Sequence, residues 1–383
     1  MRRLFPLVAA VILTDTMFYA AITPLLPGYA DDLGLSKGAA GVLSASYAAG
    51  TLIAAIPSGF LAARIGFRAT MLVGLGLLGV SSVAFAFGDS VAVLDPARFA
   101  EGVGGACAWT GGLGWLLAAA PADRRGEMIG AALAAAIFGI LLGPVIGGIA
   151  TVTGPEVVFC GVAVVAAAFA VWVLSVPGIA PGGVPGVRSV AAAILSAPVL
   201  FAFWLVVLPS VLSGAFDVLI PLRLDDLGAS GIAVGAAFFI AAGIEAFTAP
   251  AIGKLSDRRG RLVPIRAGLL ACPIAALILP VPGTVVLLTL ALVAVVLSMS
   301  LIWTPAMALL SDNAEATGLD LAFASALVSL AWAGGQVIGG SGFAAFAGAT
   351  TDATAYVVIA GLFAVTVAAV FARRRREAVV QTG

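Results

Sequence analysis

The sequence contains no histidine, and only 10% of its 383 residues are charged. A soluble globular domain carries about 25% charged residues, so this composition excludes an ordinary water-soluble protein. Without histidine, proton transfer near neutral pH has to rely on carboxylates. The net charge is zero, which gives no reason to expect a nucleic-acid partner.

Cysteine is also scarce, because Cys107, Cys160 and Cys272 are the only three and each lies in an apolar run. We interpret them as packing residues. No Cys and His cluster of metal-binding spacing is present, so we expect no metal site and no cofactor. The nucleotide-binding pattern G-x-x-x-x-G-K-[ST] is missing as well, which excludes transport driven by a P-loop.

Apolar residues dominate the sequence. They make up 62% of the chain, and the mean hydropathy is +1.17. A helix needs about 20 mostly apolar residues to cross a bilayer, and the sequence predicts twelve such stretches. The first contains Asp15 and is too long for a cleaved signal peptide. The predicted spans are 4–28, 38–62, 67–88, 91–119, 126–152, 155–176, 198–222, 230–252, 262–280, 284–310, 318–348 and 351–372.

The longest break between these stretches, 177–197, is rich in proline and glycine and suits a flexible joint. It predicts an N-terminal bundle over 1–176, a linker over 177–197 and a C-terminal bundle over 198–383. Basic residues set the orientation, because cytoplasmic loops are enriched in Lys and Arg. Of the 19 in the chain, only Lys37 and Arg223 fall in outer loops and Arg98 falls inside a helix. This predicts a multi-pass protein of the bacterial inner membrane with both termini cytoplasmic.

The two bundles repeat each other at an offset of 194 residues, which later slips to 192. Asp31-Asp32-Leu33-Gly34 returns as Asp225-Asp226-Leu227-Gly228, and Trp109-Thr110 returns as Trp303-Thr304. Both copies of the six-helix unit run in the same direction, so the repeat is parallel. Parallel halves of this kind can rock about a central site and expose it to each side in turn.

A glycine-rich and basic motif joins the second and third predicted spans of each half. The second-half copy is Gly253-Lys-Leu-Ser-Asp257-Arg258-Arg259-Gly260-Arg261. This pattern resembles the signature G-x-L-x-D-R-x-G-R of the major facilitator superfamily. The alternative is a basic loop that merely obeys the charge rule. The resemblance implies twelve transmembrane helices in the all-α fold of that family.

The first-half copy of the motif keeps Gly59, Arg64 and Gly66 but has Ala63 where the family has an acid. In the family, that acid helps to hold the inner side shut. We therefore expect Asp257 to do this, close to the segment from Arg125 to Glu127.

The fifth span carries Gly139, Gly143, Pro144, Gly147 and Gly148. Glycines spaced by four residues allow close helix contact, and the proline removes one helix hydrogen bond. The pattern resembles the motif of the antiporter branch of the superfamily, although general helix packing is the alternative.

The fourth span carries Arg98 and Glu101, followed by Gly102 and Gly104. It resembles the R-x-x-x-G-x-G motif, whose arginine the family ties to proton transfer. A buried arginine needs partners, and Asp95 and Glu101 both lie three residues away. A purely structural ion cluster remains open.

Asp15 lies near the middle of the first span, where drug:proton antiporters and vesicular amine transporters carry an acid that faces the substrate path. One carboxylate that binds either a cation or a proton provides a basis for exchange, although a structural hydrogen bond to a neighbouring helix is the alternative. Glu245 and Asp217 are further acids in the second half. Glu245 suits a site role and a structural role equally well. Asp217 lies near the outer end of its span, and a simple position at the outer interface is the alternative to a site role.

Aromatic and amide side chains on the central spans could line an apolar pocket near Asp15, although each alone could simply pack. They are Tyr19, Trp109, Phe138, Trp303, Trp332 and Gln336. The resemblance implies proton-driven efflux of a small lipophilic or cationic molecule, without a cofactor and as a monomer. A proton-coupled carrier of sugars, amino acids or other metabolites is the alternative, and a membrane sensor is a remote one. An enzyme is not expected, because no catalytic constellation is present.

Overall fold

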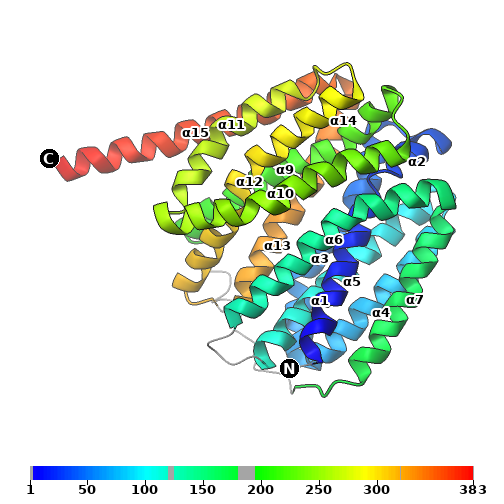
Figure 1. Cartoon of the computed structure of the whole chain (residues 1–383). Coiled ribbons are helices and arrows are strands. Elements are labelled where there is room, and N and C mark those ends of the chain that lie inside the picture. Colours follow the sequence, from blue (N-terminus) through cyan, green and yellow to red (C-terminus); the bar gives the residue numbers. More distant parts are fainter. Residues whose placement is uncertain (1–2, 120–124, 180–194, 320, 383) are drawn as a thin grey trace.

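The computed structural model describes residues 3–119, 125–179, 195–319 and 321–382, and its regular elements there are helices. Figure 1 shows them as two groups of long rods that are inclined to each other. The first group comprises α1 (Leu4–Ala21), α2 (Leu26–Asp32), α3 (Lys37–Ile65), α4 (Phe67–Ala86), α5 (Val91–Ala119), α6 (Arg125–Thr153) and α7 (Pro155–Leu174). The second comprises α9 (Ala197–Asp226), α10 (Gly231–Arg259), α11 (Leu262–Ile278), α12 (Val285–Ala316), α13 (Leu321–Val337), the π-helix η2 (Ile338–Phe343), α14 (Ala344–Ala349) and α15 (Asp352–Thr382).

Within the described residues, nine helices are long and apolar enough to cross a membrane. They are α1, α3, α4, α6, α7, α9, α10, α12 and α15, and each coincides with a predicted span. The other three predicted spans correspond to α5, α11 and the rod formed by α13, η2 and α14. Most of the predicted linker lies outside the described residues.

Two predicted spans differ from the structure in their continuity. The first was expected to run through 4–28, but α1 ends at Ala21 and α2 begins at Leu26. Pro24 and Pro27 explain the break, because proline lacks the N–H that a continuous helix needs. The span predicted over 318–348 contains a π-helical turn at Ile338–Phe343, which a hydropathy pattern does not reveal.

The internal repeat is visible in the backbone. Gly66 and Gly260 end α3 and α10 with φ of 86° and 88°, a left-handed conformation that favours glycine. Ser36 and Ser230 cap the starts of the same two helices by accepting hydrogen bonds from Ala39 N and Ala233 N. The two halves therefore share local geometry at matched positions.

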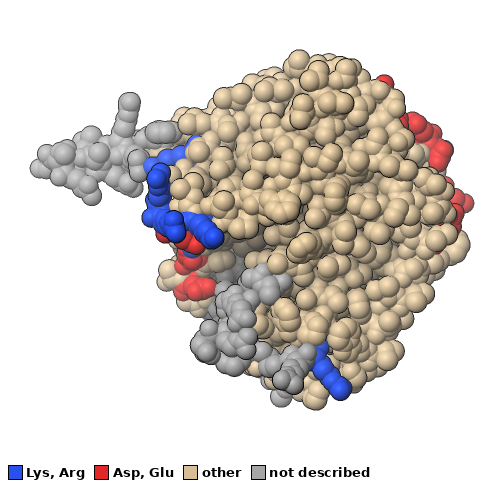
Figure 2. All heavy atoms as spheres, in the orientation of Figure 1, with Lys and Arg blue, Asp and Glu red and all other residues tan. Residues whose placement is uncertain are grey.

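Charged side chains gather at the two ends of the bundle, and the sides between them are mostly uncharged (Figure 2). We call the end with the α3–α4 and α10–α11 turns the basic end, because it carries Arg64, Arg68, Arg258, Arg259 and Arg261. The opposite end carries Lys37 and Asp352 together with both copies of the Asp-Asp-Leu-Gly segment.

The two halves meet along two seams, one between α6 and α10 and one between α3 and the α13–η2–α14 rod. Both seams are tightest toward the opposite end. A Cβ atom on Gly41 would collide with the backbone of Gly340, whereas nearer the basic end a Cβ on Gly334 would meet Leu52 only at 3.8 Å. The halves are therefore closed together at the opposite end and diverge toward the basic end.

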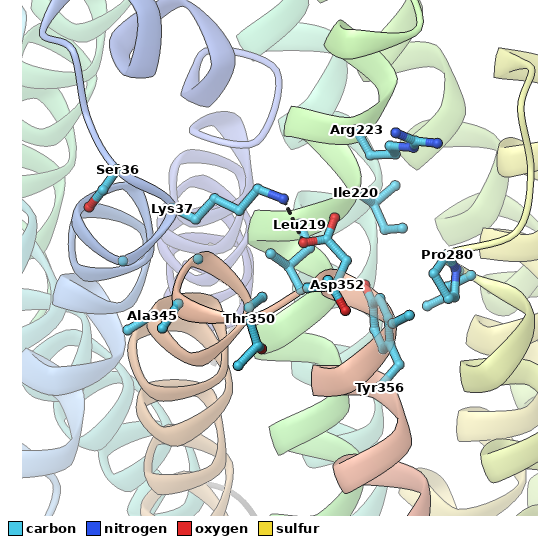
Figure 3. A pocket seen from close by; sticks show the side chains of 17 residues that line it. Ser36, Lys37, Leu219, Ile220, Arg223, Pro280, Ala345, Thr350, Asp352 and Tyr356 are labelled. Carbon is cyan, nitrogen blue, oxygen red and sulfur yellow. Dashed lines mark hydrogen bonds and ion pairs between the residues drawn. The ribbon is translucent and has the colours of Figure 1, made fainter.

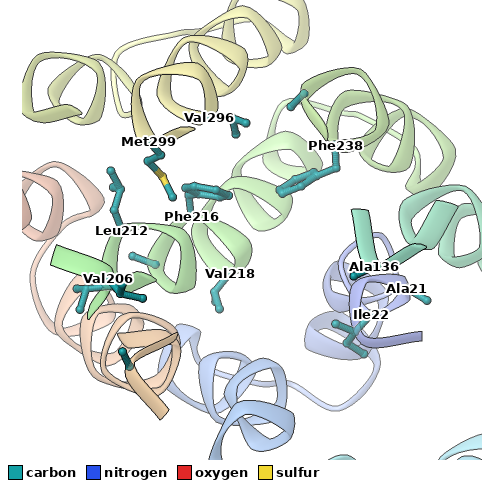
Figure 4. Close-up of a cluster of buried hydrophobic side chains, with 14 of the residues drawn as sticks. Ala21, Ile22, Ala136, Val206, Leu212, Phe216, Val218, Phe238, Val296 and Met299 are labelled. Carbon is teal, nitrogen blue, oxygen red and sulfur yellow. The ribbon is translucent and has the colours of Figure 1, made fainter. Parts of the chain in front are cut away.

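The interior of the second half is filled by large apolar side chains from several helices (Figure 4). Phe216 of α9 and Phe238 of α10 approach with ring centroids 6.4 Å apart, and Met299 of α12 is buried near them. Because lipid chains are as apolar as these side chains, close packing rather than exclusion of water holds such a bundle together.

Candidate functional site

Asp15 is a fully buried carboxylate in α1, on the side of the helix that faces α3 and α5. Its Oδ2 accepts hydrogen bonds from the Tyr47 hydroxyl at 2.9 Å and from Trp109 Nε1 at 3.0 Å. Its Oδ1 has no partner among the described residues, and a Cβ on Gly105 would come within 2.9 Å of it. The carboxylate is thus held by neutral donors, with one oxygen left free beside a glycine.

Arg98 of α5 is buried next to this group and forms an ion pair of 2.8 Å with Glu101. Its guanidinium also donates to the backbone carbonyls of Phe18 and Tyr19 in α1 and lies 5.4 Å from the ring centroid of Tyr47. Such partners offset the cost of a charge in the membrane. Glu101 therefore neutralises Arg98, and the expected second acid, Asp95, forms no ion pair with it in the described structure.

An aromatic cluster lies where α1 and α3 face α13. The Tyr19 ring is 4.9 Å from the Tyr47 ring and 5.3 Å from the Trp332 ring, measured between centroids. Gln336, one turn after Trp332, donates a 2.9 Å hydrogen bond from Nε2 to the Tyr19 hydroxyl. These contacts join the two halves through polar groups near Asp15.

The same amide of Gln336 contacts Asp217 of α9, whose Oδ2 lies 3.4 Å from Nε2. The sequence left open whether Asp217 belongs to the outer interface, and the structure places it beside the cluster. Tyr47 was not predicted at all. The Gln336 amide thus connects Asp217 with Tyr19, and Tyr19 packs against Tyr47, which donates a hydrogen bond to Asp15.

Glu245 of α10 lies in a separate environment. Its Oε1 accepts a 2.7 Å hydrogen bond from Ser300 of α12, and its side chain is partly exposed. Trp303 of α12 packs against the apolar core of the second half. Phe138 of α6 is 58% exposed. The contacts that bind Asp15 to its neighbours do not extend to these three predicted site residues in the described structure.

The glycines of α6 hold it against α1. A Cβ on Gly139, Gly143 or Gly147 would collide with α1 between Leu13 and Ala21, and on Gly147 also with Pro24 just after the helix. Gly148 instead faces the start of α10, and the carbonyl of Pro144 lies against Gly235. The glycine motif therefore sets the distance between α6 and α1, which carries Asp15, and also the seam with the second half.

The basic motif at the α10–α11 turn is stabilised within its own half. Arg261 pairs with Asp257 and with Asp312 of α12, at 2.5 and 3.3 Å. Gly59 and Gly253 have no atom within 4 Å of a built Cβ, so these glycines are open in this state. The expected contact of Asp257 with residues 125–127 involves side chains that lie outside the described set.

The opposite end carries an ion pair that joins the two halves. Lys37, the first residue of α3, pairs with Asp352, the first residue of α15, at 2.5 Å. Among the described residues no group of three His, Cys, Asp or Glu side chains could hold a metal ion. The site therefore consists of buried acids, one paired arginine, tyrosines and an amide, which can bind protons, cations or polar groups.

Comparison with known proteins gives a match to one family model. Residues 8–340 match the family model described as Major Facilitator Superfamily. No curated protein sequence shows significant similarity to the chain.

Solved structures with the same fold cover nearly the whole chain. A D-xylose–proton symporter matches with a TM-score of 0.72 and 17% identity over 94% of this chain and 96% of its own. A POT family transporter in complex with a thioalcohol-conjugated peptide matches with a TM-score of 0.76 and 14% identity, over 97% and 96%. A POT family transporter in complex with 5-aminolevulinic acid matches with a TM-score of 0.75 and 14% identity, over 96% and 95%. At such identities the likeness concerns the fold alone.

Proposed function

This chain belongs to the Major Facilitator Superfamily and is a secondary transporter, and on that premise we propose that it exchanges protons for a small lipophilic or cationic molecule. The observation that carries the proposal is the environment of Asp15. Its carboxylate is fully buried and, among the described residues, is bound only by the neutral donors Tyr47 and Trp109, so that one oxygen has no partner there.

A buried carboxylate without an ion-pair partner is stable either with a proton or with a bound cation. Binding of a proton therefore weakens the binding of the cation, and binding of the cation weakens that of the proton. Exchange requires a coupling free energy between the two binding events, and this competition provides it. Glu101 differs from Asp15, because its Oε2 is already paired with Arg98. We assign the exchangeable proton to Asp15 and a positioning role to Arg98 and Glu101.

The surroundings of Asp15 favour an apolar or cationic substrate. Tyr19, Tyr47 and Trp332 present aromatic faces near the acid, and such faces attract organic cations. Asp217 supplies a second carboxylate, held within the second half by Gln336, whose amide also bonds Tyr19 across the interface. We propose that Asp217, rather than the more distant Glu245, shares the binding of substrate or proton with Asp15.

The described state fits a transporter open toward the basic end. We place that end and both termini on the cytoplasmic side of a bacterial inner membrane, following the charge rule. The substrate would then enter from the cytoplasm and leave after the seams have closed at the basic end. We further propose that the monomer is the working unit, with residues 177–197 linking the two bundles.

A proton-coupled carrier of a polar metabolite is the second candidate. The Tyr19 hydroxyl and the Gln336 amide are hydrogen-bonding groups at the interface, and groups of this kind suit a sugar or an amino acid. The D-xylose–proton symporter shares the fold. The two candidates differ in the substrate that a proton gradient moves.

Transport in proteoliposomes decides between them. The purified protein is reconstituted, a pH gradient is imposed, and movement of lipophilic amines, sugars and amino acids is measured in parallel. Uptake of amines against their gradient in exchange for protons would support the proposal. Movement of a sugar or amino acid together with protons, with no effect on amines, would replace it with the second candidate.

A further inference from the structure

A pocket of about 830 Å³ lies at the opposite end, away from the Asp15 cluster (Figure 3). The ends of α9 and α11, the turn between α14 and α15, and the first residues of α3 form its walls. The volume falls within the range of about 300–1,000 Å³ that is usual for small-ligand sites. The function proposed above does not use this pocket.

The charges that line the pocket are not balanced. Lys37 is paired with Asp352, but Arg223 of α9 forms no ion pair in the described structure. The pocket therefore carries one uncompensated positive charge. A guanidinium presents several N–H donors in a planar fork that matches the oxygens of a phosphate group.

Tyr356 of α15 provides a second and independent sign of a missing partner. Its side chain lines the pocket and is only 1% exposed, yet its hydroxyl has no hydrogen-bond partner among the described residues. Buried hydroxyls are normally hydrogen-bonded. A ligand oxygen in the pocket would supply the partner that the protein does not.

One wall of the pocket is apolar and continues onto an apolar outer surface, while Ser36, Thr350 and Thr351 add hydroxyl groups to the lining. Ile220 and Leu279 are wall residues. Close to Leu279 on the outside of α11, Ile278 is 47% exposed and Val281 is 75% exposed. A ligand with one negative charge and an attached apolar chain would match the positive charge of Arg223 and the apolar surface outside the pocket.

We propose that this pocket binds a singly charged phosphate diester, with phosphate oxygens accepting hydrogen bonds from the Arg223 guanidinium and the Tyr356 hydroxyl. The headgroup of an anionic phospholipid is the source that the neighbouring apolar surface favours. A free phosphate ester has the same recognition chemistry and is distinguished by experiment.

Native mass spectrometry of the full-length protein, with phosphatidylglycerol and phosphatidylcholine as probes, tests the proposal. Wild type should retain phosphatidylglycerol in preference to phosphatidylcholine, and Arg223→Gln should weaken that retention by roughly tenfold. Tyr356→Phe should weaken it by about threefold. The matched control is Arg259→Gln, which removes an exposed arginine at the basic end and should leave retention unchanged.

Thermal unfolding in detergent keeps the test independent of folding defects. Because the Tyr356 hydroxyl has no partner without ligand, Tyr356→Phe should unfold no earlier than wild type in lipid-free detergent. When phosphatidylglycerol is added, the unfolding temperature of Tyr356→Phe should rise less than that of wild type. Displacement of the lipid by glycerol 3-phosphate would support the site and assign a free solute to it. Equal retention of phosphatidylglycerol by wild type and both pocket variants, or equal retention of the two lipids by wild type, would overturn the proposal.

Discussion

Gln336 in the second half donates a hydrogen bond to the hydroxyl of Tyr19 in the first half, with 2.9 Å between Nε2 and the oxygen. The same nitrogen lies 3.4 Å from Asp217, and the Tyr19 ring packs on Tyr47, which holds Asp15. A change in the charge of either acid can therefore reach the contact between the halves through only a few side chains.

Removing this cross-interface hydrogen bond should shift the conformational equilibrium. A neutral hydrogen bond contributes about 1 kcal/mol, so Gln336→Leu and Tyr19→Phe should each reduce the population of the described state by roughly fivefold. Spin labels at Ile65 and Leu262, which are exposed near the basic ends of the two halves, report that population as a distance distribution.

The double variant provides the control for this experiment. If both single variants break the same bond, the shift in the double variant should equal that of either one, because coupled sites are not additive. Fully additive shifts would show that Tyr19 and Gln336 act separately.

Asp15→Asn should abolish transport that is driven by a pH gradient. Asparagine can still accept hydrogen bonds from Tyr47 and Trp109, but it has no carboxyl proton to exchange. We expect uphill transport in proteoliposomes to fall by more than about tenfold, while exchange of labelled for unlabelled substrate at equal pH continues. Asp89→Asn, at an exposed position between α4 and α5, should leave both activities intact. Wild-type gradient-driven rates in Asp15→Asn would remove this acid from the mechanism.

Breaking the ion pair between Lys37 and Asp352 should loosen the opposite end. The two side chains are 35% and 20% exposed, so the pair contributes at most about 1 kcal/mol. Lys37→Met or Asp352→Asn should therefore raise the reactivity of a cysteine at the buried position Ala45 by up to about fivefold. The experiment requires a background in which Cys107, Cys160 and Cys272 are replaced.

The exchanged pair, Lys37→Asp with Asp352→Lys, should restore the low reactivity because it reverses both charges. If the exchanged pair reacts as fast as the single variants, the charges do not hold this end together.

Two glycines of the basic motif should respond in opposite ways to alanine. Gly260 has φ of 88°, where a Cβ costs about 1–2 kcal/mol, so Gly260→Ala should lower the unfolding temperature. Gly253 lies inside α10 with no atom near a built Cβ, and alanine favours a helix over glycine by about 0.5–1 kcal/mol. Gly253→Ala should therefore raise or preserve the unfolding temperature in detergent. Equal losses in both variants would show that the backbone conformation of Gly260 is not the cause.

The helices were predictable because lipid imposes a simple length and polarity rule. The span predicted over 91–119 coincides with α5, and 262–280 differs from α11 by two residues at one end. The break after Ala21 was not predicted, although Pro24 and Pro27 give a local reason for it. The π-helical turn at Ile338 has no comparable signal, since it depends on how α13 packs against α9 and α3.

The candidate site was predictable where a charge is isolated in an apolar run. Asp15 and Arg98 are conspicuous for this reason, and the spacing of three residues gave the pairing of Arg98 with Glu101. Tyr47 carries no charge, so in a sequence it cannot be told from a packing residue. The contact of Asp217 with Gln336 was not predicted, because the sequence alone does not give how α9 and α13 pack against each other.

The π-helical turn that follows Gln336 has a mechanical consequence. The wider coil of Ile338–Phe343 interrupts the regular α-helix between α13 and α14, and interruptions of this kind are frequent at functional sites. Gly340 within this turn and Ala344 beyond it pack against Gly41, whereas Gln336 before the turn contacts Asp217. A tilt of α13 taken up at this turn would move Gln336 while the contact with Gly41 stays closed, so that the opposite end would remain sealed during the movement.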